Sequence, residues 1–439
     1  MASAQDTRTR PPAEPLGTAT RRAALRLLDA VLRRGEPLEQ ALAGATRALP
    51  GGPDRGLAHA IAAETLRRLP DLDALIDSAT KQRLPDDAKA RFALRIALVQ
   101  ALALKTPPHA AIATVLPLVD GGPRKLVHGV FGTLMRGGAA LPEVPTLPAD
   151  VADRWSRAWG EEVAAGAARA VAAVPPLDLT LAQPQATGVV GLEGASLMPR
   201  HLRLGDRGPV ETLAGFAEGA WWVQDIAASL PARMIPHDGG SVVDVCAAPG
   251  GKSLQLAAAG LDVTALDVSA TRLERFRENL ARTRLTARVV CGDALAWSPP
   301  APVDHVLVDA PCSATGIFRR HPDVLHRVRP AVIAEMAVLQ QRILARAADW
   351  VRPGGTLVYA TCSLEPAEGE EQIVRFLSAR ADYALQLPPG FREQLASGMA
   401  NAVRPLAGAD GEVVRTLPGM LAEQGGCDGF FIARLVRRG

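Results

Sequence analysis

Between residues 241 and 363 the sequence alternates short β-branched runs with longer, helix-forming stretches. Five such runs occur: SVVDV, DVTALDV, ARVVCGD, DHVLVDA and GTLVYAT. Strands that alternate with helices along a chain form a parallel sheet covered by helices on both faces. The pattern therefore predicts a doubly wound α/β domain, and it constrains the fold more than any other feature of the chain.

The ends of these runs carry acids and thiols, which can bind a ligand or take part in a reaction. The first four lead to acids, and cysteines accompany the last two: Asp244, Asp267, Asp293, Asp309, Cys312 and Cys362. In a doubly wound sheet, ligands bind beyond the carboxyl ends of the strands. We therefore expect these side chains to surround one site, although a single Asp at such a position can equally be a helix cap or turn residue.

The first run leads into CAAPGGKS (Cys246–Ser253), which nearly matches the phosphate-binding pattern GxxxxGK[ST]. Cys246 stands where that pattern needs its first glycine, and Pro249 removes one backbone donor. These two departures argue against a nucleoside triphosphatase. Gly250 and Gly251 instead let the chain pass close to another kind of ligand and start the next helix.

An acid at the end of the second run indicates which ligand this is. Asp267 follows Asp244 by 23 residues, close to the offset of the acid that binds ribose hydroxyls in nucleotide-binding folds. The loop is not GxGxxG, which argues against NAD and FAD. An adenosine-bearing cofactor without a pyrophosphate fits better, and S-adenosylmethionine is the leading candidate. Asp293 would then accept a hydrogen bond from the adenine amino group.

The chain has five cysteines, and none lies in a CxxC pair or in zinc-ligand spacing. No metal and no disulfide framework is therefore expected. Cys291 fits a buried strand interior, and Cys427 lies in a glycine-rich loop without an expected catalytic role. Cys312 and Cys362 do not look like core positions. A thiolate that adds to C6 of a pyrimidine makes C5 nucleophilic, and a nearby carboxyl such as Asp309 would assist protonation of N3.

The N-terminal third has a different character. Residues 1–20 read as a flexible tail, and residues 21–137 carry only helical signals, interrupted at Gly and Pro, which predicts a bundle of about six or seven helices. Between Arg21 and Arg136 there are 18 Lys or Arg and 11 Asp or Glu, whereas the whole chain has a net charge of only +3. This basic excess indicates a nucleic-acid partner, and solvated helix surfaces are the alternative explanation.

A linker, LPEVPTLPAD, leads to a middle segment in which residues 151–174 read as one helix. We therefore divide the chain into a tail (1–20), a helical domain (21–140) and an α/β domain (150–439) that comprises an N-terminal subdomain (150–236) and a core (237–439). No apolar run is long enough for a transmembrane helix, and the N-terminus lacks the apolar core of a signal peptide. We expect a cytoplasmic monomer that does not associate with membranes.

Several long segments together resemble one family. CAAPGGKS, ALDVS, CGDA, VDAPCSATGIFRRHPD and GTLVYATCSLEPAEGEEQI are similar, in this order, to the motif series of RNA cytosine-C5 methyltransferases. DGFFIARL (428–435) and GAWWVQDIAASLPARMI (219–235) extend the similarity on both sides. The helical region resembles the RNA-binding NusB-like domain. The combination resembles the Sun/RsmB family of bacterial methyltransferases that act on small-subunit ribosomal RNA.

The resemblance implies a fold and a set of roles. It implies a Rossmann-like, S-adenosylmethionine-dependent methyltransferase core joined to an all-α NusB-like domain. Cys362 in TCS would be the nucleophile, Cys312 in PCS would assist product release, and Asp309 would contact cofactor and base. The cofactor-binding set would be Cys246, Ala247, Ala248, Pro249, Gly250, Gly251, Lys252, Asp267, Asp293 and Asp309.

Basic residues follow Cys312 closely: Arg319, Arg320, His321, His326, Arg327 and Arg329. We expect them to position RNA through phosphate contacts, with a solvated loop as the alternative. The sequence thus predicts transfer of a methyl group to C5 of a cytosine in 16S ribosomal RNA through a covalent cysteine–C6 adduct. The alternatives are the same chemistry on tRNA or large-subunit rRNA, and a non-catalytic RNA-binding assembly factor.

Overall fold

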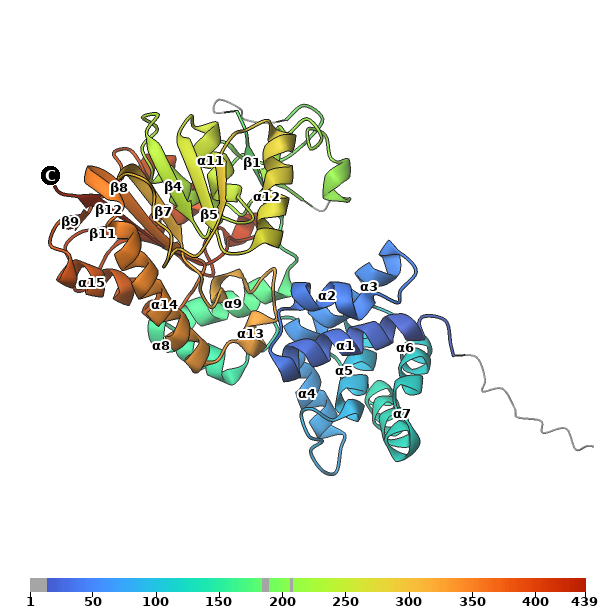
Figure 1. Cartoon of the computed structure of the whole chain (residues 1–439). Helices are drawn as coiled ribbons and strands as arrows, with labels where there is room; N and C mark the ends of the chain where they lie inside the picture. The colour runs from blue at the N-terminus through green and yellow to red at the C-terminus, as the bar shows by residue number, and fades with distance from the viewer. Residues whose placement is uncertain (1–13, 184–188, 206–207) are drawn as a thin grey trace, which may run out of the picture. The chain divides into compact units, whose positions relative to one another are not determined.

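The computed structural model describes residues 14–183, 189–205 and 208–439. The chain forms two compact units (Figure 1). The first contains Met1–Pro148 and the short segment His321–Arg327, and the second contains Ala149–Arg320 and Val328–Gly439. Most of the predicted tail, residues 1–13, lies outside the described residues.

The first unit is helical, as the sequence predicts. Its helices are α1 (Thr18–Arg34), α2 (Leu38–Thr46), α3 (Gly52–Arg67), α4 (Leu69–Ser78), α5 (Lys89–Leu102), α6 (Pro108–Val115), α7 (Gly121–Arg136) and the short α13 (Val324–Arg327). Helix α1 begins before the predicted boundary at residue 21. Thr18 and Thr20 are both buried, and the Thr20 hydroxyl donates a hydrogen bond to Asp54 at 2.9 Å.

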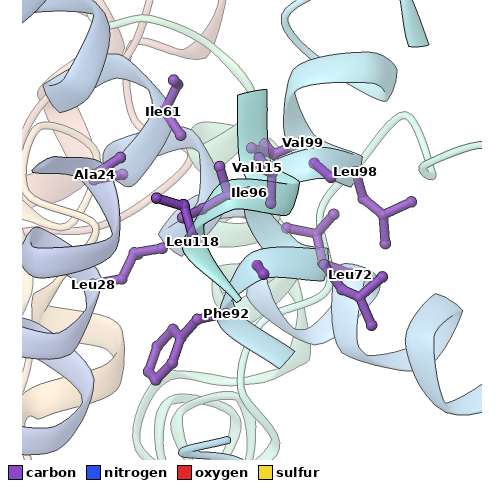
Figure 2. Close-up of a cluster of buried hydrophobic side chains, with 14 of the residues drawn as sticks. Ala24, Leu28, Ile61, Leu72, Phe92, Ile96, Leu98, Val99, Val115 and Leu118 are labelled. Atoms are coloured by element: carbon purple, nitrogen blue, oxygen red, sulfur yellow. The ribbon is translucent and has the colours of Figure 1, made fainter. Parts of the chain in front are cut away.

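Helix α5 lies at the centre of this unit, and eleven of its consecutive residues, from Ala90 to Gln100, are buried. Figure 2 shows its apolar side chains meeting those of the surrounding helices. The labelled members of this cluster are Ala24, Leu28, Ile61, Leu72, Phe92, Ile96, Leu98, Val99, Val115 and Leu118. Two arginines of α5, Arg91 and Arg95, are also buried, and both pair with Asp73.

The second unit begins with two helices where the sequence predicts one. Helices α8 (Ala149–Trp159) and α9 (Glu161–Ala172) are separated at Gly160, whose φ of 91° lies in the left-handed region that glycine adopts without strain. A small antiparallel sheet follows. It has the order β2-β1-β3 and consists of β1 (Leu177–Leu181), β2 (His201–Leu204) and β3 (Trp221–Val223).

The main sheet has the order β10-β11-β12-β8-β7-β4-β5-β6, and β9 also pairs with β12. Its five parallel strands are the five predicted runs: β4 (Ser241–Val245), β5 (Asp262–Asp267), β6 (Arg288–Cys291), β7 (Val303–Asp309) and β8 (Val351–Thr361). Antiparallel strands extend the sheet beyond β8: β9 (Tyr383–Leu385), β10 (Val403–Pro405), β11 (Glu412–Thr416) and β12 (Phe430–Arg437). The predicted α/β fold is therefore confirmed.

Helices cover both faces of this sheet (Figure 1). On one face lie α10 (Leu230–Arg233), α11 (Gly251–Ala258) and α12 (Ala270–Thr283), and on the other lie α14 (Pro330–Ala348) and α15 (Glu370–Ala379). Neighbouring strand residues point to opposite faces, so that Val242 packs with α11 and Val243 with α14. Among the described residues, no helix is long and apolar enough to cross a membrane.

Candidate active site

The strand order reverses at β4, because the next strand along the chain, β5, lies on one side of β4 and β7 lies on the other. Such a switch point opens a crevice beyond the carboxyl ends of the strands. A cavity of about 410 Å³ lies here, and its lining includes Pro249, Gly251, Lys252, Asp309, Cys362 and Phe430. A larger cavity of about 610 Å³ lies beside α9, but neither Cys312 nor Cys362 lines it. Of the predicted strand-end residues, Asp309 and Cys362 line the smaller cavity, whereas Asp244, Asp267, Asp293 and Cys312 do not.

The loop between β4 and α11 has the conformation of a ligand-binding turn. Cys246 has a φ of 61°, so this cysteine adopts the left-handed conformation that a phosphate-binding loop assigns to glycine. Gly250 has a φ of 102°, and a Cβ there would lie 1.9 Å from Cδ2 of Phe276. Gly250 is therefore required by both backbone conformation and packing. Ala247 and Pro249 line the cavity, as expected of this loop.

Three carboxylates gather around Cys246. Burial, together with the charges of Asp309, Asp267 and Asp244, raises the pKa of the Cys246 thiol to about 12. Asp244 is fully buried, which raises its own pKa to about 7, although a 2.5 Å hydrogen bond from Ser253 opposes the shift. Its other oxygen, Oδ1, is buried without a hydrogen-bond partner among the described residues.

Asp267 accepts hydrogen bonds from two backbone amides of the neighbouring loops. Its Oδ2 accepts a hydrogen bond from the amide of Ala248 at 3.0 Å, and its Oδ1 accepts one from the amide of Ser269 at 2.8 Å. Each oxygen retains a further lone pair for a ligand hydroxyl. Val268 follows directly and is 73% exposed, an unusual exposure for an apolar residue at a strand end.

Asp293 lies on the neighbouring loop after β6. It is exposed, and its Oδ1 accepts a hydrogen bond from the amide of Leu295 at 2.9 Å. This contact is the turn-capping role that the sequence left open for any single acid. Cys291, expected in a strand interior, is instead exposed at the end of β6, because β6 is the edge strand.

Lys252 and Asp309 both line the cavity and form an ion pair. Lys252 Nζ donates to Asp309 Oδ2 at 2.6 Å and lies 5.3 Å from the centre of the Phe430 ring. Burial lowers the pKa of Lys252, but the charge and hydrogen bond of Asp309 outweigh burial and raise it overall. In a nucleoside triphosphatase the lysine at this position would bind phosphates, whereas here Lys252 binds the carboxylate of Asp309.

The two predicted thiols lie in contact. Cys312 follows β7, Cys362 follows β8, and their Sγ atoms are 3.5 Å apart. Cys362 lines the cavity, whereas Cys312 is not among the lining residues. The hydrogen bond with Cys362 and burial raise the pKa of Cys312 well above its ordinary value. Cys312 therefore holds a proton at neutral pH and can donate it to the sulfur of Cys362.

One buried carboxylate connects the two cysteine loops. Glu368 accepts hydrogen bonds from the amide of Ser313 at 2.8 Å and from Gln340 Nε2 at 3.0 Å. It also accepts from the hydroxyls of Ser313 and Ser363, the residues that directly follow the two cysteines. Burial raises the pKa of Glu368, and these donors oppose the shift. Glu368 therefore holds both loops at once.

Helix α8 supports the loop after Cys362 from the other side. Trp155 Nε1 donates to Glu365 Oε1 at 3.1 Å, and Arg154 Nε donates to Glu365 Oε2 at 2.9 Å. Trp159 Nε1 donates to the carbonyl of Leu364 at 2.7 Å. The backbone that carries the nucleophile candidate is therefore fixed by side chains more than 200 positions earlier.

Several arginines of the basic cluster after Cys312 form ion pairs within the protein. Arg319 and Arg320 are paired with Asp225 and Asp428 at 3.0–3.5 Å, in a group of four charges. Arg319 is buried, and burial raises the pKa of Asp428 to about 6.

Farther along the same segment, the ring of His326 contacts the carbonyl of Leu66 at 2.7 Å, and Arg327 pairs with Asp323 at 2.8 Å. Carboxylates far away in the sequence neutralise Arg319 and Arg320, and Asp323, four residues earlier, neutralises Arg327, so these three arginines are not the free phosphate ligands that the sequence suggested.

Comparison with known proteins identifies the family. A family model described as 16S rRNA methyltransferase RsmB/F matches residues 232–436, and the NusB family model matches residues 18–132. The ribosomal RNA small subunit methyltransferase B of Xylella fastidiosa is 35% identical over 96% of this chain and 98% of that relative. The chain belongs to the 16S rRNA methyltransferase RsmB/F family. The protein of the same name from Erwinia tasmaniensis is 34% identical over 82% of this chain and 90% of the relative.

Solved structures support the fold of this RsmB/F family member. The crystal structure of PH0851 has a TM-score of 0.70 and 23% identity, and covers 95% of this chain and 98% of its own. NSun6 from Pyrococcus horikoshii with SFG has a TM-score of 0.55 and 19% identity over 66% of this chain and 98% of its own. The predicted methyltransferase fold, NusB-like part and family are confirmed.

As an RsmB/F methyltransferase, the chain uses S-adenosylmethionine, and the residues present fit that cofactor. The cofactor carries a positively charged sulfonium, ribose hydroxyls and a flat adenine. Asp244, Asp267 and Asp309 supply negative charge and acceptors, and the exposed Val268 supplies an apolar surface. The unpartnered Oδ1 of Asp244 adds a buried acceptor that suits a cationic ligand.

Sequence reasoning missed several residues of this site. Gln224, Asp225 and Asp428 line the cavity, and Glu368 connects the cysteine loops. All four lie inside segments that resemble family motifs. The resemblance alone could have drawn attention to them, but their contacts depend on partners that are distant in sequence.

Proposed function

We propose that the protein methylates C5 of a cytosine in 16S ribosomal RNA through a covalent bond between Cys362 and C6. The observation that carries the proposal is the 3.5 Å contact between two thiols at adjacent strand ends, with one of them lining the cavity. The choice of 16S rRNA is supported by the names of relatives that match almost the whole chain.

The cofactor would lie across the ends of β4, β5 and β6. Asp267 would bind the ribose hydroxyls, Asp293 the adenine amino group, and Val268 one face of the adenine. The loop from Cys246 to Lys252 would pass beside the methionine part, and the buried carboxylate of Asp244 would stabilise its positive charge. S-adenosylmethionine, when bound, supplies the electrophilic methyl group that C5 of the base attacks.

Cys362 would begin the reaction. Its sulfur forms a bond to C6 of the cytosine, the electron pair of the C5=C6 bond shifts toward the ring, and N3 takes up a proton. Lys252 and Asp309 are the groups placed for this proton: Nζ of Lys252 holds it, and the carboxylate of Asp309, 2.6 Å away, relays it. C5 is then nucleophilic and forms the new carbon–carbon bond.

Cys312 would complete the reaction. Its raised pKa depends first on the hydrogen bond with Cys362 and also on the charge of that residue. Both contributions disappear once Cys362 sulfur is bonded to carbon, so that Cys312 can lose its proton to solvent. Its thiolate then removes the C5 proton, the C5=C6 bond re-forms, N3 returns its proton to the Lys252–Asp309 pair, and Cys362 leaves as a thiolate.

Glu368 would be a positioning residue in this sequence of steps. It touches neither base nor cofactor, but it fixes the serines next to both thiols. A carboxylate with four donors from three elements holds the loops more rigidly than packing alone. We propose that Glu368 sets the distance between the thiols of Cys312 and Cys362.

The helical part, residues 21–140, would bind RNA, and residues 150–439 would carry out catalysis. Assays with the purified full-length protein and labelled cofactor on stripped 16S rRNA, 23S rRNA and tRNA test this assignment. We expect 5-methylcytosine in 16S rRNA alone. Product in tRNA or 23S rRNA alone would support the alternative substrates, and product in none of them would support a non-catalytic assembly factor.

A further inference from the structure

Acids and bases are unevenly distributed in the first unit. Residues 88–142 contain seven Lys or Arg but a single acid, Asp120. Two of the seven, Arg91 and Arg95, are buried and pair with Asp73 and Asp77. The remaining cations of this stretch, including three on α7, are exposed.

In helix α1, by contrast, three of the five arginines form ion pairs with carboxylates. Arg33 and Arg34 both pair with Asp29, at 2.9 and 2.5 Å, and Arg22 pairs with Glu14 at 2.6 Å. Among the described residues, no carboxylate forms an ion pair with Arg124, Lys125 or Arg136 of α7. Among the described residues, α7 therefore carries three exposed cations without an ion-pair partner, whereas α1 carries one, Arg26.

The cations of α7 lie on one side of the helix. At about 100° per residue, Arg124, Lys125, His128 and Arg136 fall within an arc of about 120°. The buried residues of the helix occupy the other side: Val127, Val130, Phe131 and Leu134. The guanidinium of Arg136 also reaches back toward the middle of the helix, since a Cβ on Gly132 would lie 3.0 Å from its Nη1.

This basic face of α7 (Arg124, Lys125, His128 and Arg136) has the chemistry of a polyanion site. It carries several unpaired cations and no acid within the arc. Leu126, the exposed apolar residue of the helix, lies outside it. A protein interface would need an apolar centre, whereas phosphate backbones are bound by exposed cations alone.

We propose that the basic face of α7 binds the phosphate backbone of the substrate RNA. This inference rests on the proposed function only in taking RNA as the substrate. It locates the RNA contact of the helical part on α7 rather than on α1. Phosphate contacts of this kind fix the position of the RNA without reading its sequence.

Two triple variants of the full-length protein test this proposal. Arg124→Gln/Lys125→Gln/Arg136→Gln removes three charges from α7, and Arg22→Gln/Arg33→Gln/Arg34→Gln removes three paired charges from α1 as the matched control. Binding of a 16S rRNA fragment is measured between 50 and 200 mM salt. Thermal melting and cofactor binding check that both variants are folded.

For the α7 variant we expect the slope of log affinity against log salt to become shallower by about 2 to 3, since each lost phosphate contact removes about 0.7–0.9. Its affinity at intermediate salt should fall by about 10-fold or more, and the α1 control should stay within about 2-fold of the unsubstituted protein. An unchanged slope, or an equal loss in the α1 control, would overturn the proposal. Either result could occur while 16S rRNA is still methylated, so failure here is distinguishable from failure of the proposed function.

Discussion

Substitution of Glu368 by Gln tests how the two thiols are held. The amide oxygen can replace Oε1, which accepts from Ser313 N and Gln340 Nε2. The amide NH₂ would then face the two serine hydroxyls, which can rotate to accept from it. Four charge-assisted hydrogen bonds become neutral ones at about 1 kcal/mol each, and relief of the buried charge offsets part of this loss. We expect the free energy of unfolding to fall by about 1–3 kcal/mol.

The effect on catalysis should be larger than the effect on stability. A displacement of about 1 Å between catalytic groups lowers a rate by about 100-fold, so we expect kcat to fall by about 10- to 100-fold. Cofactor affinity and KM for RNA should change little, because Glu368 does not line the cavity. If Cys312 is displaced while Cys362 still reacts, a covalent protein–RNA adduct should accumulate in denaturing gels.

Asp304→Asn is the matched control for this experiment. Asp304 also accepts hydrogen bonds from the amide and hydroxyl of one serine, Ser241, at 2.8 and 2.7 Å. It lies near the start of β7, whereas Asp309 and the site lie at its end. The control should lose stability without accumulating adduct. Unchanged kcat in folded Glu368→Gln, or equal losses of kcat in both variants, would refute a positioning role for Glu368.

Two further predictions concern the cofactor end of the site. Burial raises the folded-state pKa of Asp244 to about 7, above the unfolded value of about 3.9, so its stabilising effect is complete below about pH 4 and is lost as the pH rises through 7. Without cofactor, the free energy of unfolding of the unsubstituted protein should therefore fall by about 2–4 kcal/mol relative to that of Asp244→Asn between pH 4 and 8. Urea denaturation measures this, and the same pH dependence of unfolding free energy in both proteins would contradict it. Asp267→Asn keeps one acceptor for the loop amides but loses the charge, and calorimetry should show cofactor binding weaker by about 1.5–3 kcal/mol; unchanged affinity would remove Asp267 from the ribose site.

The parallel sheet and its strand ends could be predicted because they depend on local patterns. Each strand is a short β-branched run between helical stretches, and parallel pairing brings the carboxyl ends together whatever the intervening sequence. The proximity of Cys312 and Cys362 follows from this, since β7 and β8 are neighbours. The break at Gly160 was missed because glycine is tolerated inside helices and its φ is not visible in the sequence.

Residues whose environment depends on distant partners could not be predicted. Arg319 and Arg320 look like phosphate ligands until Asp225 and Asp428, about 100 positions away on either side, are placed beside them. Glu368 looks like one acid in an acidic helix start until Ser313 reaches it from another loop. The small sheet of β1, β2 and β3 was not predicted as strands because its members have only three to five residues.

The central claim, that Cys362 attacks the base and Cys312 releases it, is tested most directly by trapping the covalent intermediate. Cys312→Ala, Cys362→Ala and the double variant are incubated with 16S rRNA, with and without S-adenosylmethionine, and resolved on denaturing gels. Cys312→Ala should accumulate a protein–RNA adduct that depends on the cofactor, and Cys362→Ala and the double variant should form none. Accumulation in Cys362→Ala instead would reverse the two roles, and retained methyl transfer in both single variants without any adduct would contradict the thiol mechanism.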